Sequence, residues 1–248
     1  MSPAAVHIEN LGFKYPGQSA MCFSGLNLEV PAGSRFGIFG PNGAGKTTLM
    51  NCMTGLLNFR QGTIKLLGQE IKKHDKTINS LFGFVPQDFS FYEELSPVEN
   101  LSFFGAWYGL DKKIIKKRIA ELLQVLDLEG DAKIRVQNFS GGMKRRINLA
   151  IGVMHNPAIL FLDEPTVGVD VHTRYAIISY LKQLNNSGTT LIYTSHQLGE
   201  AEELCEQVAL IDEGKIIAHD RLARLLEEHR EDGLEGLFLN LTGKTYRE

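Results

Sequence analysis

Residues 40–48, "GPNGAGKTT", place three glycines, one lysine and two threonines within nine positions. Glycines let backbone N–H groups approach an anion closely, and a helix that begins there adds a favourable dipole. Lys46 would then reach the β- and γ-phosphates of a nucleotide, and the Thr47 hydroxyl would be a ligand of Mg²⁺. The pattern predicts a phosphate-binding loop. Its predicted ligand-binding residues are Gly40, Asn42, Gly43, Ala44, Gly45, Lys46, Thr47 and Thr48.

A second motif, "ILFLDEP", supplies two carboxylates at positions 163 and 164. The four apolar residues before them predict a buried strand, and ligands of α/β proteins bind at the carboxyl ends of such strands. Asp163 would hold Mg²⁺, directly or through water. Glu164 is the candidate general base that polarises the attacking water. Together the two motifs predict a site of nucleotide hydrolysis.

Apolar runs broken by glycine and proline predict the strands that must carry these motifs. They occupy positions 5–15, 26–30, 34–40, 62–68, 82–87, 158–164, 189–195 and 206–212. Helices are predicted at 46–57, 174–186 and 222–230, a hairpin arm at 212–220, and a short tail after residue 230. This alternation of strands and helices predicts an α/β fold.

The stretch from 89 to 155 has helical character instead. Ser96, Pro97 and Glu99 are an N-cap serine, a first-turn proline and a capping-box glutamate. Two amphipathic helices follow. Their apolar faces carry Ile115, Ile119, Leu122 and Leu126 in the first, and Met143, Ile147, Ala150 and Met154 in the second. The basic runs "KKRIAE" and "KRR" on these helices are expected to be solvated or to face a partner.

The composition limits the class of protein. A length of 248 residues allows one large domain or two small ones, and a net charge of -3 argues against nucleic-acid binding. Three scattered cysteines, Cys22, Cys52 and Cys205, lack metal spacing and suggest a reducing compartment. The sequence shows no signal peptide and no apolar run of about 18 residues. We therefore expect the chain to be soluble when isolated.

A third motif, "NFSGGMKRR", places Ser140, Gly141 and Gly142 at the start of a helix shortly before the Asp163 strand. This arrangement resembles the nucleotide-binding subunits of ABC transporters, whose signature is usually written L-S-G-G-Q. Phe139 stands in place of the leucine and Met143 in place of the glutamine. The departure leaves the serine–glycine core intact and removes one polar side chain near the nucleotide.

The resemblance covers nearly the whole chain and implies further site residues. Tyr15 matches the aromatic residue that stacks on adenine, and Gln87 matches the glutamine that senses Mg²⁺ and the attacking water. Asp170 matches the aspartate that couples two active sites across a dimer. His196 matches the histidine that contacts the γ-phosphate. The implied catalytic residues are Glu164, His196, Lys46 and Gln87, and the implied metal ligands are Thr47, Gln87 and Asp163.

The resemblance also implies an architecture. The whole chain, 1–248, is expected to be one ABC ATPase domain of the P-loop NTPase class, with a central mostly parallel sheet, an antiparallel β arm and an inserted helical subdomain. Residues 1–88 and 156–220 would form the nucleotide-binding core lobe and 89–155 the helical signature subdomain. Residues 221–248 would form a C-terminal helix and tail.

The implied function is ATP hydrolysis with Mg²⁺ by two subunits paired head to tail. The second subunit is a copy or a homologue, and a separate integral-membrane subunit moves the cargo. The motifs look like the bacterial branch that exports drugs, lipids or polysaccharides, at the cytoplasmic face of the cell membrane. Two alternatives stay open. One is a soluble ABC ATPase, of which an iron–sulfur assembly component is hardest to exclude, and the other is a non-hydrolysing regulatory module.

Overall fold

The computed structural model describes residues 4–71, 76–195 and 197–243. A large sheet runs through these residues in the strand order β10–β9–β3–β8–β7–β6. Its strands are β3 (Arg35–Phe39), β6 (Phe82–Val85), β7 (Ile159–Asp163), β8 (Thr190–Thr194), β9 (Gln207–Asp212) and β10 (Lys215–Arg221). Neighbours pair in parallel, except that β10 is antiparallel to β9.

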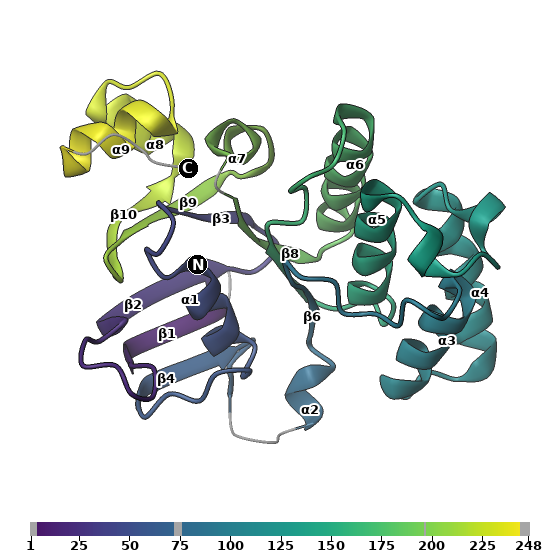
Figure 1. Cartoon of the computed structure of the whole chain (residues 1–248). Helices are drawn as coiled ribbons and strands as arrows, with labels where there is room; N and C mark the ends of the chain where they lie inside the picture. Colours follow the sequence, from purple (N-terminus) through teal and green to yellow (C-terminus); the bar gives the residue numbers. More distant parts are fainter. Residues whose placement is uncertain (1–3, 72–75, 196, 244–248) are drawn as a thin grey trace.

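A smaller sheet, entirely antiparallel, has the order β2–β1–β4–β5. It contains β1 (Ala4–Phe13), β2 (Phe23–Pro31), β4 (Gln61–Leu66) and β5 (Gln69–Glu70). In Figure 1 this sheet lies on one side of the large sheet, and the helices between β6 and β7 lie on the opposite side. The mostly parallel sheet with an antiparallel arm is therefore confirmed.

The large sheet separates two apolar cores, and the side chains of β7 contribute to both. Ile159 and Phe161 belong to the apolar cluster that includes the small sheet and α1 (Lys46–Met53). Leu160 and Leu162 belong to the cluster on the opposite side, with α6 (Val171–Asn186) and the helices between β6 and β7. Successive strand residues point to opposite faces. A continuous apolar run is therefore what a strand buried on both faces requires.

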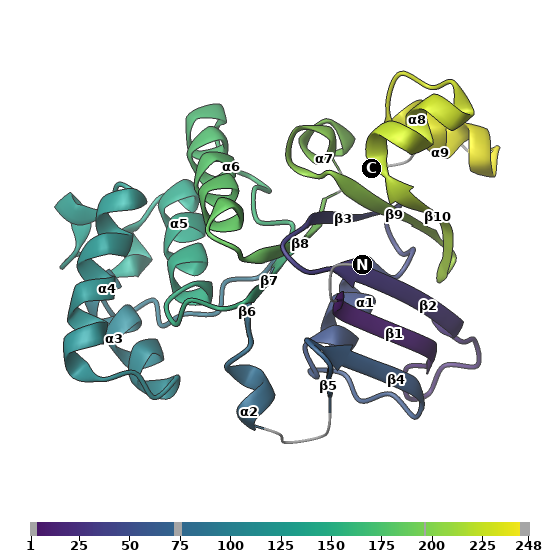
Figure 2. The same ribbon diagram turned by 180° about the vertical axis from the view of Figure 1, so that it is seen from behind.

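Three α-helices connect β6 to β7: α3 (Pro97–Trp107), α4 (Lys112–Val125) and α5 (Gly141–Gly152), with short 3₁₀ turns at Glu129–Asp131 and Val136–Asn138. They gather in one group beside α6 (Figures 1 and 2). The capping box is confirmed, because the Glu99 carboxylate accepts from Ser96 N at 2.8 Å and Ser96 Oγ accepts from Glu99 N at 3.3 Å. The insert boundaries at 89 and 155 remain a proposal.

The end of the chain differs from the prediction. The predicted helix at 222–230 is α8 (Leu222–His229), but the predicted tail contains another helix, α9 (Leu234–Thr242). Leu234, Leu237 and Phe238 of α9 are buried, so tertiary packing stabilises a helix too short to persist alone. The Leu234 N–H donates to Glu202 on α7 (Leu198–Leu204) at 2.6 Å. The prediction of only a short tail after residue 230 is therefore wrong, because this stretch forms a helix.

The topology positions the predicted motifs at one edge. The phosphate loop follows β3, Gln87 follows β6, and Asp163 ends β7. Since β3, β8, β7 and β6 are parallel neighbours, their carboxyl ends lie along the same edge of the sheet. None of the described helices is long and apolar enough for a membrane crossing.

Candidate nucleotide-binding site

The phosphate loop adopts the backbone that its glycines allow. Gly43 and Gly45 have φ values of 81° and 109°, in the left-handed region. A Cβ at Gly45 would also come within 2.8 Å of the Phe23 ring. Gly45 is the N-cap of α1, so the first N–H groups of that helix face the space beyond the loop. The loop therefore presents N–H donors where an anion would bind.

Lys46, the first residue of α1, is buried at 6% exposure. Its Nζ donates to the carbonyl oxygens of Gly40 at 2.7 Å and Pro41 at 3.2 Å. Burial lowers the pKa of Lys46, and the nearby Glu164 and Asp163 carboxylates oppose this shift. The ammonium group thus lies between the loop and the two carboxylates, where a phosphate would compete for it.

Asp163 is buried at the end of β7. It accepts a hydrogen bond from Thr194 Oγ1 at 2.6 Å. Burial raises the pKa of Asp163, and hydrogen bonds from the Thr194 and Thr47 side chains oppose that rise. The Thr47 hydroxyl and the Asp163 carboxylate therefore lie together, as the oxygen donor pair that Mg²⁺ prefers.

The described residues contain no group of three or more His, Cys, Asp and Glu that could hold a metal ion. A site with one carboxylate and one hydroxyl fits Mg²⁺ only if phosphate oxygens and water complete the octahedron. The pair beside Lys46 thus fits a Mg²⁺ ion that arrives with a nucleotide.

Glu164 adjoins Gln87, which comes from the other side of the site. Gln87 Nε2 donates to Glu164 Oε2 at 3.1 Å. Glu164 has a φ of 50°, an uncommon conformation for a residue with a Cβ, and its N–H donates to the Thr194 carbonyl at 3.1 Å. Strained backbone of this kind gathers at functional sites because the surroundings hold it. The candidate base is thus fixed by both its backbone and its side chain.

A cavity of 630 Å³ contains most of the predicted residues. Those lining it are Tyr15, Asn42, Gly43, Gly45, Lys46, Thr47, Thr48, Gln87 and Glu164. The Tyr15 hydroxyl lies 2.9 Å from Thr48 Oγ1, so the aromatic residue stands next to the phosphate loop. Gly40 and Ala44 do not line the cavity; Gly40 contributes its carbonyl to Lys46, and Ala44 is buried.

The cavity also has lining residues that no sequence motif marked: Gln18, Ala20, Met21, Cys22 and Val167. The first four lie in the turn between β1 and β2, close to Tyr15 in the chain. That proximity was the one available signal, since this turn has no phosphate-binding pattern. His196, the remaining predicted catalytic residue, lies outside the described residues.

The signature residues lie elsewhere. Ser140, the N-cap of α5, accepts from Met143 N at 3.3 Å, and both Ser140 and Gly141 are exposed. A Cβ at Gly142 would lie 3.5 Å from the Asp170 carboxylate, which caps α6. The structure thus brings the predicted signature and Asp170 together at two adjoining helix N-termini, and neither lines the cavity.

The comparisons with known proteins identify the family of this chain. The family described as "ABC transporter" matches residues 23–167, which contain the phosphate loop, the signature and both carboxylates. The chain belongs to the ABC transporter family. The predicted ABC-type ATPase is confirmed, and so is ATP as its nucleotide.

Two curated ABC proteins illustrate the similarity. The chain is 44% identical over 194 residues to the linearmycin resistance ATP-binding protein LnrL of Bacillus subtilis (strain 168). This match covers 78% of the chain but 62% of LnrL, so the chain spans less than two thirds of that relative. It is 37% identical over 224 residues to the Nod factor export ATP-binding protein I of Rhizobium sp. (strain N33), covering 90% of the chain and 74% of that protein.

A solved structure supports the ABC fold over nearly the whole length. The structure entitled "Structure of ATP binding subunit of ABC transporter" superposes with a TM-score of 0.87 at 26% identity. The match covers 96% of this chain and 99% of the other. The predicted ABC fold class is therefore confirmed.

The two departures from the ABC signature are explained by packing. Phe139 is buried at 7% exposure in the apolar cluster of the helical segment, and Met143 packs against the same cluster. A larger apolar residue at 139 therefore fills the core, where leucine is usual. Met143 leaves Ser140 in place as the helix N-cap.

Arg145 adjoins the candidate site, and no signal in the sequence pointed to this position. The prediction that "KRR" is solvated or faces a partner is wrong for it, because Arg145 is buried at 8% exposure. Its Nη1 donates to the Gln87 carbonyl, its Nε donates to Val167 O at 3.3 Å, and its guanidinium lies 4.8 Å above the Phe89 ring. Arg145 thus connects α5 to Gln87 and Val167, the residues on either side of the candidate base Glu164.

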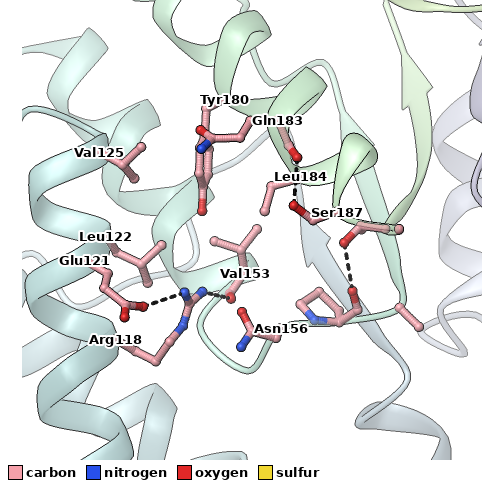
Figure 3. Close-up of a pocket in the computed structure, with 14 residues that line it drawn as sticks. Arg118, Glu121, Leu122, Val125, Val153, Asn156, Tyr180, Gln183, Leu184 and Ser187 are labelled. Carbon is pink, nitrogen blue, oxygen red and sulfur yellow. Dashed lines mark hydrogen bonds and ion pairs between the residues drawn. The ribbon is translucent and has the colours of Figure 1, made fainter.

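A second cavity, of 540 Å³, lies away from the ABC motifs, between α4 and α6 (Figure 3). Arg118 dominates it, donating to Val153 O at 2.9 Å and to the Glu121 carboxylate at 3.0 Å. The Arg118 guanidinium is therefore already hydrogen-bonded to residues of its own chain. No predicted site residue lines this cavity.

Proposed function

We propose that this chain is the ATP-hydrolysing subunit of an exporter, that it uses ATP with Mg²⁺, and that it works in head-to-tail pairs. One observation is the main support for the proposed head-to-tail pairing. Ser140, Gly141, Gly142 and Asp170 gather at an exposed surface and do not line the cavity that contains Lys46 and Glu164 of the same chain. These residues are consequently presented to another molecule.

The chemistry of the two surfaces is complementary. The cavity would hold a phosphate chain on one side, while the N-terminus of α5 offers backbone N–H groups and the Ser140 side chain. A γ-phosphate between them would receive charge-assisted hydrogen bonds from both subunits. Hydrolysis would remove this bridge, so the pair would close with ATP and open after the reaction.

The roles inside the cavity follow from position. Lys46 and the loop N–H groups would neutralise the phosphates, and Thr47 with Asp163 would hold Mg²⁺. Glu164 would accept a proton from the attacking water, with Gln87 orienting its carboxylate at 3.1 Å. His196 is retained as a proposed γ-phosphate contact, and Asp170 as the proposed link between the two sites.

A substitution in the signature tests the pairing. Ser140→Arg is expected to abolish steady-state ATP hydrolysis, because the long side chain would block the surface that meets the partner's phosphate. Equilibrium binding of ATP to the monomer should stay within about twofold, since Ser140 does not line the cavity. Fluorescent-nucleotide titration and phosphate release measure the two effects.

Ser187→Arg is the matched control, because Ser187 is an exposed serine at the opposite end of α6 from Asp170. It should retain hydrolysis. If Ser140→Arg instead loses binding to the monomer, Ser140 acts on its own nucleotide and head-to-tail pairing is wrong for this chain.

An exposed aromatic surface in the segment that follows Gln87 supports the proposal of a membrane-spanning partner. Tyr92, Phe103 and Trp107 are 47%, 42% and 75% exposed and form a chain of ring contacts at centroid distances of 5.0 and 6.5 Å. Large exposed aromatic clusters mark sites of protein interaction. Arg145 touches both the Gln87 carbonyl and the ring of Phe89, which precedes Tyr92 by three positions in the chain. A partner docked here could sense the state of the nucleotide.

Co-expression with a candidate multi-span membrane subunit tests this surface. The Phe103→Ala, Trp107→Ala double variant should lose at least about tenfold of the co-purified membrane subunit, as expected when hot-spot aromatics are removed. The isolated variant should retain its basal ATPase rate. Leu239→Ala, which removes a 46% exposed residue of α9, is the control and should change neither.

The exporter branch and its cargo class, a drug, lipid or polysaccharide, are proposals that rest on the names of relatives, one in linearmycin resistance and one in Nod factor export. Those names do not favour the soluble iron–sulfur alternative. Co-purification with a multi-span protein separates the two functions, and phosphate release separates an ATPase from a regulatory module. The proposed location is the cytoplasmic face of the membrane.

A further inference from the structure

Outside the cavity, a buried carboxylate joins three separate elements. Glu200, on α7, is 3% exposed. Its Oε2 accepts from Thr166 Oγ1 at 2.5 Å and from Tyr193 Oη at 2.7 Å. Its Oε1 lies 2.9 Å from Arg174 Nε on α6. These contacts come from the loop after Glu164, from strand β8 and from the helix after Asp170.

This cluster requires a physical explanation because burying a carboxylate is costly. The cost is offset only where donors and an opposite charge converge with good geometry. Apolar residues of similar volume could fill the same space without that cost. Desolvation and the Glu200 charge together raise the pKa of Tyr193 well above its usual range, so its hydroxyl keeps its proton to donate. The cluster therefore holds a defined arrangement of the elements that supply it.

Thr166 links the Glu200 carboxylate to the candidate base Glu164. It lies two residues after Glu164, inside two successive turns. The Val167 N–H donates to Glu164 O at 3.3 Å, and the Val169 N–H donates to Thr166 O at 3.5 Å. Anchoring the Thr166 hydroxyl therefore fixes the path by which the chain leaves the strained residue Glu164. Only one other residue, Pro165, separates the anchor from the base.

Arg174 links the Glu200 carboxylate to the signature region. It belongs to the first turn of α6, where its N–H donates to the Asp170 carbonyl at 2.9 Å. A Cβ on Gly142 of the signature would lie 3.5 Å from the Asp170 carboxylate. Glu200 thus connects, through two partners, to the candidate base and to the surface proposed to meet a second subunit.

We propose that Glu200 is a positioning residue for ATP hydrolysis: its carboxylate holds Thr166 and Arg174 so that Glu164 and Asp170 keep their places when ATP and a second subunit bind. Glu200 itself does not line the cavity. It acts through the loop between positions 164 and 170. The proposal rests on the ATPase role assigned to Glu164, so each comparison includes the wild-type rate.

The first test compares Glu200→Gln with Glu203→Gln. Both residues lie on α7 and both pair with Arg174, but Glu203 is 39% exposed. The glutamine at position 200 would carry no charge, and its amide N–H groups would face hydroxyl groups that now act as donors to the carboxylate. We expect kcat to fall about 10- to 100-fold, the range for misplacement of a catalytic group by a fraction of an ångström to one ångström. The KM for ATP should stay within about threefold, and Glu203→Gln should behave as wild type.

The second test separates positioning from a general structural role. Thr166→Val removes the hydroxyl at nearly constant shape and should lower kcat as Glu200→Gln does, while Thr166→Ser should restore it. The double variant Thr166→Val, Glu200→Gln should be little slower than the slower single variant, because the contact that Thr166→Val removes is one that Glu200→Gln already disturbs. If Glu200→Gln fails to fold, Thr166→Val and its serine rescue carry the test.

The outcomes are distinguishable. A wild-type chain without phosphate release would contradict the proposed ATPase function itself. An active wild type with kcat for Glu200→Gln within twofold of it overturns the positioning role. The role is also overturned if the double variant loses rate by the product of the two single losses, or if Thr166→Ser is as slow as Thr166→Val.

Discussion

Lys46→Ala is expected to reduce ATP turnover by about 10²–10³, the usual cost of removing one group that stabilises developing charge. Lys46 is the buried side-chain cation beside the phosphate loop, and its ammonium group faces Glu164 and Asp163. Without it, the two carboxylates would meet a triphosphate with no intervening positive side chain. ATP binding should therefore weaken as well as hydrolysis.

Phosphate release and isothermal titration with ATP measure the two losses. Lys113→Ala is the control, because Lys113 is an exposed lysine on α4 and its removal should change neither quantity. Lys46→Arg keeps the charge but replaces a compact ammonium with a planar fork, so it should remain impaired. Wild-type turnover by Lys46→Ala would place the phosphate site elsewhere.

Glu164→Gln is expected to lower the hydrolysis rate by about 10²–10⁴, the typical contribution of a general base. The amide has nearly the same shape, and the φ of 50° and the backbone bond to Thr194 need not change. It cannot take the proton of the attacking water. The substitution also removes a negative charge next to the γ-phosphate, which favours bound ATP.

Both effects of Glu164→Gln should trap ATP between two subunits. Size exclusion with light scattering should show a dimer for the variant with ATP, and mainly monomer for the variant with ADP and for the wild type without nucleotide. Gln87→Ala is a useful companion, because it removes the 3.1 Å contact to Glu164 without removing the base. It should slow hydrolysis by less than Glu164→Gln.

A Glu164→Gln variant that hydrolyses ATP at the wild-type rate would move the base to another residue, and His196 would be the first to examine. A dimer that forms equally well with ADP would contradict a clamp that opens after hydrolysis. Either result would leave the ABC family assignment intact, since that rests on the sequence match over residues 23–167.

Much of this protein was predictable because its determinants are local. The phosphate loop needs only nine consecutive residues, and the structure places Lys46 at the helix start as predicted. The capping box at Ser96 and the apolar face of α4 also follow from short-range spacing. The fully apolar "ILFL" predicted a buried strand, and β7 is buried on both faces.

Predictions failed where packing between distant segments decides the outcome. The sequence of α9 contains leucines at helical spacing, but a nine-residue helix is marginal alone, and its contacts with the rest of the chain decide whether it forms. The "KRR" run has the charge of a solvated surface. Arg145 is nevertheless buried, because the carbonyls of Gln87 and Val167, from two other segments, accept hydrogen bonds from its guanidinium group.

The sequence by itself determined the candidate groups for the chemistry, because phosphate and magnesium chemistry demand particular residue types at particular spacings. Only the tertiary structure decided how those groups meet. The order β3–β8–β7–β6 brings Lys46, Glu164 and Gln87 to one cavity although they are far apart in the chain, and it leaves Ser140 outside that cavity. The Glu200 cluster is the extreme case: its partners at positions 166, 174 and 193 share no period or motif, so only the folded arrangement of α7, β8 and α6 reveals it.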